Sequence, residues 1–179
     1  MTAGQREQLL RALWPQGAKS KLGVWAILDC ARDPQIYRAL LESRLEFRCL
    51  YSGKLPRELE LVAPQLVELF PDNRLTTQWL DQGWGQSWGV LLKVADPSNL
   101  RHHLRKLLTV RDEHGRKLLL RYYDPRVLRP FLRSCDPAQL ELVFGKTTAY
   151  VAEDEDGVDL TEFGLRAGHL IERSLRTSP

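Results

Sequence analysis

The sequence has few cysteines, no long apolar run and little excess of either charge. Its 179 residues include three cysteines, Cys30, Cys49 and Cys135, which are widely spaced and form neither a CxxC motif nor a Cys/His ladder. We therefore expect free thiols in a reducing compartment, and neither a disulfide framework nor a structural zinc site. The net charge of +3 is too small to indicate a nucleic-acid partner by itself.

Membrane-spanning and export signals are also missing from the sequence. No stretch approaches the ~18–20 consecutive apolar residues needed to cross a bilayer. Residues 1–14 lack the basic, apolar and small-residue regions of a signal peptide. We therefore expect a cytoplasmic protein with no membrane partner. The composition, 43% hydrophobic and 27% charged, is typical of a globular chain, and the length fits a compact single domain or two small lobes.

The dipeptide Asp-Pro occurs four times, each time before a helical pattern. An aspartate at the N-cap accepts a hydrogen bond from a free N–H of the first turn, and proline at the next position already has a helical φ. The pattern therefore predicts four Asp-capped helices. The pairs are Asp33-Pro34, Asp96-Pro97, Asp124-Pro125 and Asp136-Pro137.

Apolar runs between these signals are typical of β-strands. They lie at 24–28, 47–51, 88–94, 117–123 and 147–151. Residues 59–70 fit a helix and a strand about equally, and 5–13 and 160–175 are predicted to form flanking helices. Strands followed by capped helices indicate an α/β fold with a mixed central β-sheet and flanking Asp-Pro-capped helices.

Most motifs of enzymes are absent. The sequence has no GxxxxGK[ST] loop and no GxSxG elbow. The segment 83–89 nearly matches GxGxxG, but it precedes a strand instead of following one, so we expect a turn with Trp84 and Trp88 packed around it. His102 and His103 are adjacent and cannot chelate a metal from one helix face. The sequence thus predicts no catalytic residue, cofactor or metal site.

Two other functions remain open at this level. Asp29 and Cys30 end an apolar strand before a helix N-terminus, where the pKa of a thiol would fall, so a Cys-dependent hydrolase is one alternative. The segment 101–133 has ten Lys/Arg against three Asp/Glu, with Tyr122, Tyr123 and Phe131 interleaved. It could bind nucleic acid or phosphate, although we first interpret its arginines as partners of carboxylates such as Asp29 and Asp124. The leucines of this run are expected to occupy its core face, which argues against nucleic-acid binding.

Residues 151–162 hold six acidic residues and no basic one. Such a run is typical of a solvated turn. Docking of this acidic loop on the basic segment, in this chain or another, is the alternative interpretation.

Six short strings in order carry a family resemblance. They are WAILDCAR at 25–32, LYSG at 50–53, LVAPQLV at 61–67, WGV at 88–90, HLRKL at 103–107 and RYYDPRVL at 121–128. Together they resemble the family called domain of unknown function 4123, the effector chaperones or adaptors of type VI secretion. The resemblance implies a non-catalytic cytoplasmic adaptor, without a cofactor, that binds a toxin effector and helps load it onto the VgrG spike.

The resemblance also suggests how the chain is divided. Residues 1–21 would be an N-terminal helical extension, 22–145 the adaptor domain, and 146–179 a C-terminal strand and helix extension.

Aromatic and arginine side chains are the common anchors of protein interfaces. Trp79, Trp84 and Trp88 lie within ten residues, and we expect one or two of them to line a groove for an effector segment. The full set of candidate partner-binding residues is Trp79, Trp84, Trp88, Tyr51, Arg101 and Arg105. Residues of the family strings expected to hold the fold through caps and buried ion pairs are Asp29, Arg105, Tyr123, Asp124 and Arg126.

Overall fold

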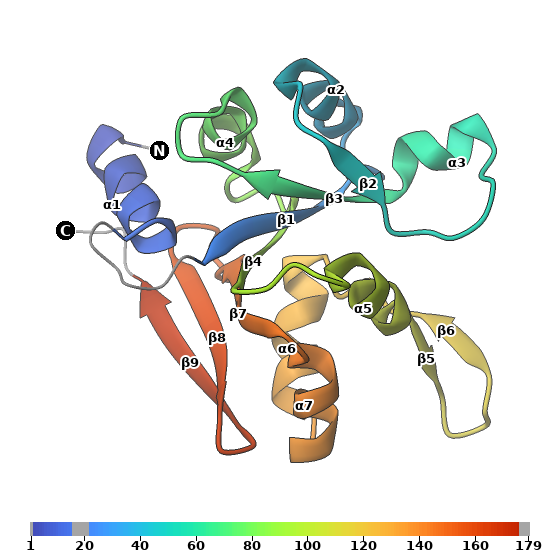
Figure 1. The fold of residues 1–179 in the computed structure, drawn as a ribbon. Helices are drawn as coiled ribbons and strands as arrows, with labels where there is room; N and C mark the ends of the chain where they lie inside the picture. The colour runs from blue at the N-terminus through green and yellow to red at the C-terminus, as the bar shows by residue number, and fades with distance from the viewer. Residues whose placement is uncertain (1, 16–21, 176–179) are drawn as a thin grey trace.

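One seven-stranded antiparallel sheet organises the chain, with strand order β2-β3-β1-β4-β7-β8-β9 (Figure 1). The computed structural model describes residues 2–15 and 22–175. The strands of this sheet are β1 (Gly23–Asp29), β2 (Phe47–Cys49), β3 (Pro64–Leu69), β4 (Gly89–Val94), β7 (Thr147–Glu153), β8 (Leu160–Arg166) and β9 (His169–Leu175). A separate two-stranded ribbon pairs β5 (Thr109–Arg111) with β6 (Lys117–Leu119).

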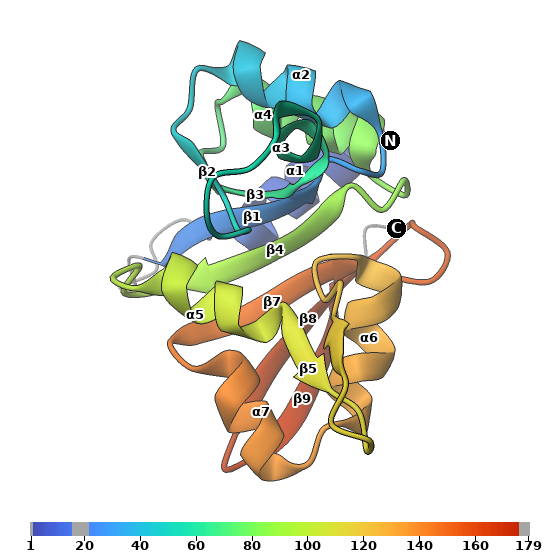
Figure 2. The same cartoon turned by 90° about the vertical axis from the view of Figure 1, so that its right-hand side faces the viewer.

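Helices pack on both faces of the sheet. They are α1 (Ala3–Leu13), α2 (Pro34–Ser43), α3 (Arg57–Val62), α4 (Arg74–Gln78), the π-helical turn η1 (Trp79–Gly83), α5 (Leu100–Leu107), α6 (Pro125–Ser134) and α7 (Pro137–Phe144). Helices α1, α2 and α4 share one core cluster with Ala26 and Leu28 of β1. Helices α5, α6 and α7 lie on the opposite face of the sheet (Figures 1 and 2). They share the other cluster with Ile27, because neighbouring side chains of a strand point to opposite faces. The α/β class is confirmed, and the described residues form a single compact domain, but the central sheet is antiparallel and not mixed as predicted.

The central strand explains the most apolar run of the sequence. Strand β1 pairs with β3 on one side and β4 on the other, so that Trp25 lies opposite both Glu68 and Leu92. Its residues from Ala26 to Leu28 are fully buried because helices cover both faces at this point.

Three of the four Asp-Pro pairs begin helices as predicted. The carboxylates of Asp33, Asp124 and Asp136 accept hydrogen bonds from backbone N–H groups in the first turns of α2, α6 and α7. Asp96 is different, since α5 begins later, after Asn99 in a left-handed conformation. The Asp96 carboxylate instead accepts from the Ser98 N–H at 2.9 Å and pairs with Lys146 at 2.6 Å. The fourth pair therefore stabilises a turn that leads into the helix.

Two internal segments differ from the predicted elements. Of the run 117–123, only Lys117–Leu119 is a strand, and it lies in the small ribbon outside the main sheet. Tyr122 and Tyr123 are nevertheless buried, because the turn that carries them packs into the core between the ribbon and α6. The ambiguous segment 59–70 holds both structures, with α3 ending at Val62 and β3 beginning at Pro64.

The predicted C-terminal helix at 160–175 is wrong. This segment is the hairpin β8–β9, whose two turn residues Ala167 and Gly168 have φ of 49° and 79°. Positive φ at both positions is what a type I′ hairpin turn requires. Strand β7 pairs with β4, so the supposed extension at 146–179 continues the main sheet as far as it is described.

Strands β1 and β4 approach each other closely at Gly89, and a substitution at this position tests how much space is left. A Cβ at this position would lie 2.1 Å from the Ile27 carbonyl oxygen. We expect Gly89→Ala to lower the free energy of unfolding by about 3 kcal/mol, because backbone and not a flexible side chain would have to move. The matched control is Gly164→Ala in β8, where a Cβ meets no heavy atom within 4 Å. Urea denaturation followed by circular dichroism measures both, and equal midpoints for the two variants would contradict this account.

Candidate functional site

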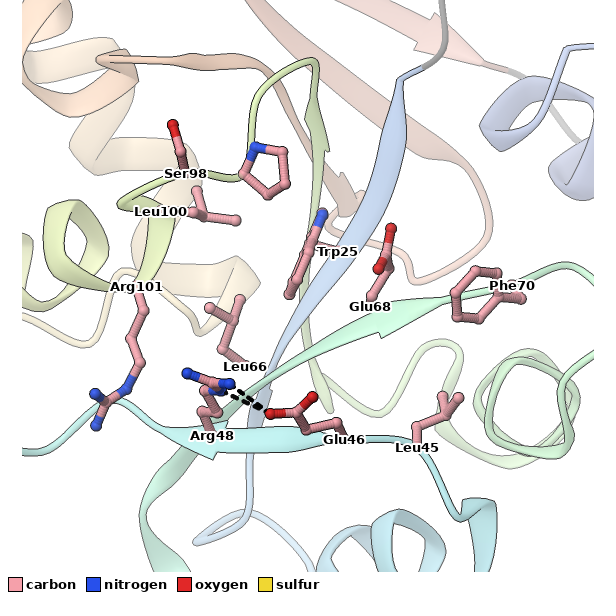
Figure 3. Close-up of a pocket in the computed structure, with 11 residues that line it drawn as sticks. Trp25, Leu45, Glu46, Arg48, Leu66, Glu68, Phe70, Ser98, Leu100 and Arg101 are labelled. Carbon is pink, nitrogen blue, oxygen red and sulfur yellow. Dashed lines mark hydrogen bonds and ion pairs between the residues drawn. The ribbon is translucent and has the colours of Figure 1, made fainter.

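A groove of about 550 Å³ lies on the sheet between the outer strands and the start of α5 (Figure 3). Its apolar surface comes from Trp25 of β1, Leu66 of β3 and Leu100 of α5, and Leu45 and Phe70 extend it at the β2–β3 end. This is the face covered by α5, α6 and α7, but these helices leave the β2 edge open. We call this hollow the first groove.

The pleat of the edge strand sets the charged rim of the first groove. Arg48 lies opposite Leu66, so its side chain projects on the groove face. The next residue toward the N-terminus, Phe47, points to the other face and packs edge-on against Tyr37 at 5.9 Å. Glu46 and Arg48 form an ion pair at 2.5 Å at the rim (Figure 3). The rim charge on this side is therefore neutralised locally.

Trp25 stands in the middle of the first groove. It is half-buried, and its Nε1 is a buried donor for which the described residues supply no acceptor. The sequence predicts a strand at residues 24–28 but does not single out Trp25 as a residue that lines a groove. The open β2 edge, which no local pattern encodes, is what leaves its ring accessible.

A second groove of about 450 Å³ lies between the segment that follows β2 and the helix α5. Its lining includes Leu50, Tyr51 and Leu59 on one side and His102, Arg105 and Lys106 of α5 on the other. A hydrogen bond of 2.9 Å from Arg101 Nε to the Cys49 carbonyl oxygen separates the two grooves. We call the two grooves with this bridge the β2–α5 surface.

The candidate partner-binding residues divide into two groups. Tyr51, Arg101 and Arg105, which are far apart in sequence, all line the β2–α5 surface. Trp79 and Trp88 are only 4% and 2% exposed and belong to the core on the opposite face, so they offer no surface to a partner.

Trp84 is the one tryptophan of the cluster that reaches the surface. It lines a separate hollow of about 230 Å³ with Leu80 and Val158, and its Nε1 donates to the Val158 carbonyl at 3.3 Å. Of the three tryptophans, Trp84 thus lines a hollow, whereas Trp79 and Trp88 are buried. Trp88 packs against the turn so closely that a Cβ on Gly83 would lie 2.4 Å from its ring.

The Gly-rich turn at 83–89 binds an internal carboxylate. Glu153 accepts hydrogen bonds from the Gly85 N–H at 2.7 Å, the Ser87 N–H at 2.8 Å and the Ser87 hydroxyl at 3.0 Å. Burial raises the pKa of Glu153, and these hydrogen bonds oppose the shift. Arg129 donates to the backbone carbonyls of Glu153 and Asp154 at 2.7 and 3.3 Å. Glu153, the last residue of β7, is thus held by the Gly-rich turn and by Arg129 of α6, whereas Glu155 and Asp156 lie exposed in the turn that follows, as the sequence predicts.

Two ion pairs join the residues expected to hold the fold. Arg121 pairs with Asp29, which is buried at the end of β1. Arg126 Nε and Nη2 donate to the Asp124 carboxylate at 2.9 and 2.6 Å. Tyr123 is buried beside them, and its pKa is raised by this burial and by a hydrogen bond with Tyr51. Arg105 is not part of this cluster, since its side chain lines the second groove.

The basic segment 101–133 does not form one continuous basic face. Arg121, Arg126 and Arg133 are in ion pairs, and Arg129 binds backbone carbonyls. Tyr122 and Tyr123 are buried and cannot stack on bases. These contacts argue against the nucleic-acid alternative for the segment as a whole.

The predicted lowering of the Cys30 pKa is wrong. Burial, with smaller effects of Asp29 and Cys49, raises the pKa of Cys30 to about 12. A thiol in this state is protonated at neutral pH and is a poor nucleophile. Within residues 2–15 and 22–175, no three His, Cys, Asp or Glu side chains are placed to hold a metal ion. No helix in the same ranges has the length and apolar character to cross a membrane.

Asp124 combines a cap with an ion pair, and two substitutions separate these roles. Asp124→Ala removes both and should lower the free energy of unfolding by about 0.5–2 kcal/mol for the cap alone. Asp124→Asn keeps a good cap but loses the charge. Burial would raise the pKa of Asp124, yet hydrogen bonds from the Arg126 side chain and N–H hold it below its ordinary value.

The lowered pKa of Asp124 gives the sign of a pH effect. The advantage of the wild type over Asp124→Asn should be full above the ordinary carboxyl pKa of about 4. It should disappear as the pH falls through the lower folded-state value. Thermal melts of both proteins across acidic pH measure this, and an advantage that persists at the lowest pH would contradict the ion-pair role.

Cys30 should resist alkylation in the folded protein. With iodoacetamide at mildly alkaline pH, we expect the half-buried Cys135 to be modified first and Cys30 only after denaturation, because Cys30 is buried and protonated. Peptide mass spectrometry of native and urea-treated samples makes the comparison. Rapid labelling of native Cys30 would revive the Cys-dependent hydrolase.

Comparison with known proteins yields one match. No curated protein and no solved structure matches the chain significantly. The family described as Domain of unknown function (DUF4123) matches residues 24–142, about two-thirds of the sequence. This range contains β1 to β6 and α2 to α6 and therefore both grooves of the β2–α5 surface. The chain belongs to the DUF4123 family.

Proposed function

We propose that this protein is a non-catalytic cytoplasmic adaptor that binds a toxin effector of type VI secretion and helps load it onto the VgrG spike. The observation that carries the proposal is the β2–α5 surface in a chain of the DUF4123 family. It combines an apolar floor, an exposed phenylalanine and arginines, which is the composition of protein-binding sites.

The first groove is suited to apolar side chains of a partner. Trp25, Leu66 and Leu100 supply the floor, and Phe70 is 48% exposed at its edge. Burying this surface against an effector segment supplies a favourable hydrophobic term of roughly 25 cal/mol per Å². An effector bound in this way is held without any bond being made or broken, as the proposed adaptor requires.

Catalysis has weaker support from the same surface. No cysteine lines either groove, and neither of the lining serines, Ser52 and Ser98, has a hydrogen bond to a histidine among the described residues. Cys30 is buried elsewhere, at the end of β1. We therefore favour binding over turnover.

An affinity purification with groove variants tests the proposal. The tagged protein is recovered from its native cytoplasm, the absorbance ratio at 260 and 280 nm is recorded, and bound proteins are identified by mass spectrometry. We expect one effector-like protein, with or without VgrG, at a protein-like ratio. Phe70→Glu should lose this partner, because the charge opposes burial of the groove.

Leu142→Glu is the matched control, since Leu142 is 71% exposed on α7, outside both grooves. Equal recovery of the partner by the wild type and Phe70→Glu would remove the first groove from the binding site. Salt-sensitive nucleic acid in place of a protein, or the adaptor alone, would overturn the proposed function.

A further inference from the structure

The second groove has a basic wall without an acidic counterpart. His102, Arg105 and Lys106 line it from α5, and no Asp or Glu is among its lining residues. None of the ion pairs formed within residues 2–15 and 22–175 includes Arg105 or Lys106. This differs from the first groove, where Glu46 neutralises Arg48 and Glu68 adds a negative charge.

Exposed leucines from two elements face the same groove. Leu59 of α3 is 40% exposed and Leu119 of β6 is 56% exposed. Single exposed leucines are common, but these two line one hollow beside a basic helix. In addition, α3 has no buried residue, so its contacts with the rest of the domain leave its apolar side chains uncovered. The groove thus offers apolar contacts and positive charge together.

We infer that the second groove binds an acidic segment of a partner protein, with apolar side chains of that segment packed between Leu59 and Leu119 and its carboxylates paired with Arg105 and Lys106. The inference rests on the proposed function, in which the effector supplies this segment. Charge complementarity selects the partner chemistry, because unpaired basic side chains at a rim steer acidic partners and disfavour basic ones.

The observations favour a protein segment over nucleic acid. Tyr51 is the aromatic residue of this lining, and its hydroxyl is engaged by Tyr123. One tyrosine does not provide the series of aromatic platforms on which successive bases of a single strand stack. Leu59 and Leu119, in contrast, would bury no apolar surface against a phosphate backbone.

A peptide-display selection on the full-length protein tests the inference. A random peptide library is selected on the wild type, and the affinity of an enriched peptide is then measured for Arg105→Glu and Lys106→Glu. We expect enrichment of Asp, Glu and large aliphatic residues, and a loss of affinity of about tenfold or more for each variant. Lys106 is exposed, so its substitution leaves the core intact.

Arg38→Glu is the matched control, because Arg38 is an exposed helix residue of α2 on the opposite face of the sheet. It should bind the peptide like the wild type, and thermal melts should show all variants folded. Peptides without acidic enrichment, or affinity unchanged by both groove variants, would overturn the inference. So would displacement of the peptide by single-stranded DNA that binds more tightly, or a dimer in solution that the groove variants dissociate.

The inference and the proposed function fail in different ways. An effector that is recovered equally by wild type and Lys106→Glu, with no acidic peptides selected, leaves the adaptor function and removes the acidic segment. Acidic peptides that bind as expected, with no effector recovered from the cytoplasm, leave the site and assign it another acidic partner.

Discussion

Burial of β1 on both faces is the constraint on which the rest of the structure depends. The strand pairs with β3 and β4, and its alternate side chains enter two different cores. Every helix layer is therefore placed relative to this one strand. The two helix layers differ in how much of the sheet they cover, since α5, α6 and α7 leave the β2 edge of their face open. The first groove of the β2–α5 surface is the direct consequence, because its lining includes sheet surface that the described helices leave open.

Internal use of charge decides which basic residues face a partner. Asp29, Asp124 and the Glu153 backbone each bind an arginine of the segment 101–133. Burying the carboxylates of Asp29 and Asp124 costs free energy, which their contacts with arginine offset. Within this segment, α5 keeps Arg101, Arg105 and Lys106 outside the ion pairs formed by the described residues. The net charge of the chain hides this distribution, because it counts paired and unpaired arginines alike.

Local signals in the sequence were the reliable ones. The N-cap role of Asp33, Asp124 and Asp136 follows from the chemistry of one residue and its neighbours, and the continuous apolar run of β1 follows from burial on both faces. The hairpin β8–β9 was mistaken for a helix, because its strands lack a strict alternation and the Ala167-Gly168 turn is not among the commonest turn dipeptides. Its strand character comes from pairing with β7, which the local sequence does not contain.

The candidate site was only partly predictable, for the same reason. Tyr51, Arg101 and Arg105 could be singled out as anchor-type residues, but their placement along one surface depends on the packing of α5 beside β2. Trp79 and Trp88 are of a residue type that commonly anchors interfaces, and yet their side chains are buried in the core. Residue type therefore indicates what a side chain could do at a surface, and only the sheet order decides whether it reaches one.

In the proposed function, the two grooves contribute to binding through different physical effects. Apolar contacts in the first groove depend weakly on salt and mainly determine how slowly a partner leaves. The unpaired charges of the second groove act over about 8–10 Å in physiological salt and mainly determine which partners approach. In the proposed function the adaptor has to recognise one effector and later give it up. A surface with a rim of exposed charge and a shallow apolar floor suits that task better than a deep enclosed pocket. The charges provide selectivity, and the shallow floor does not hold the partner too tightly to be transferred.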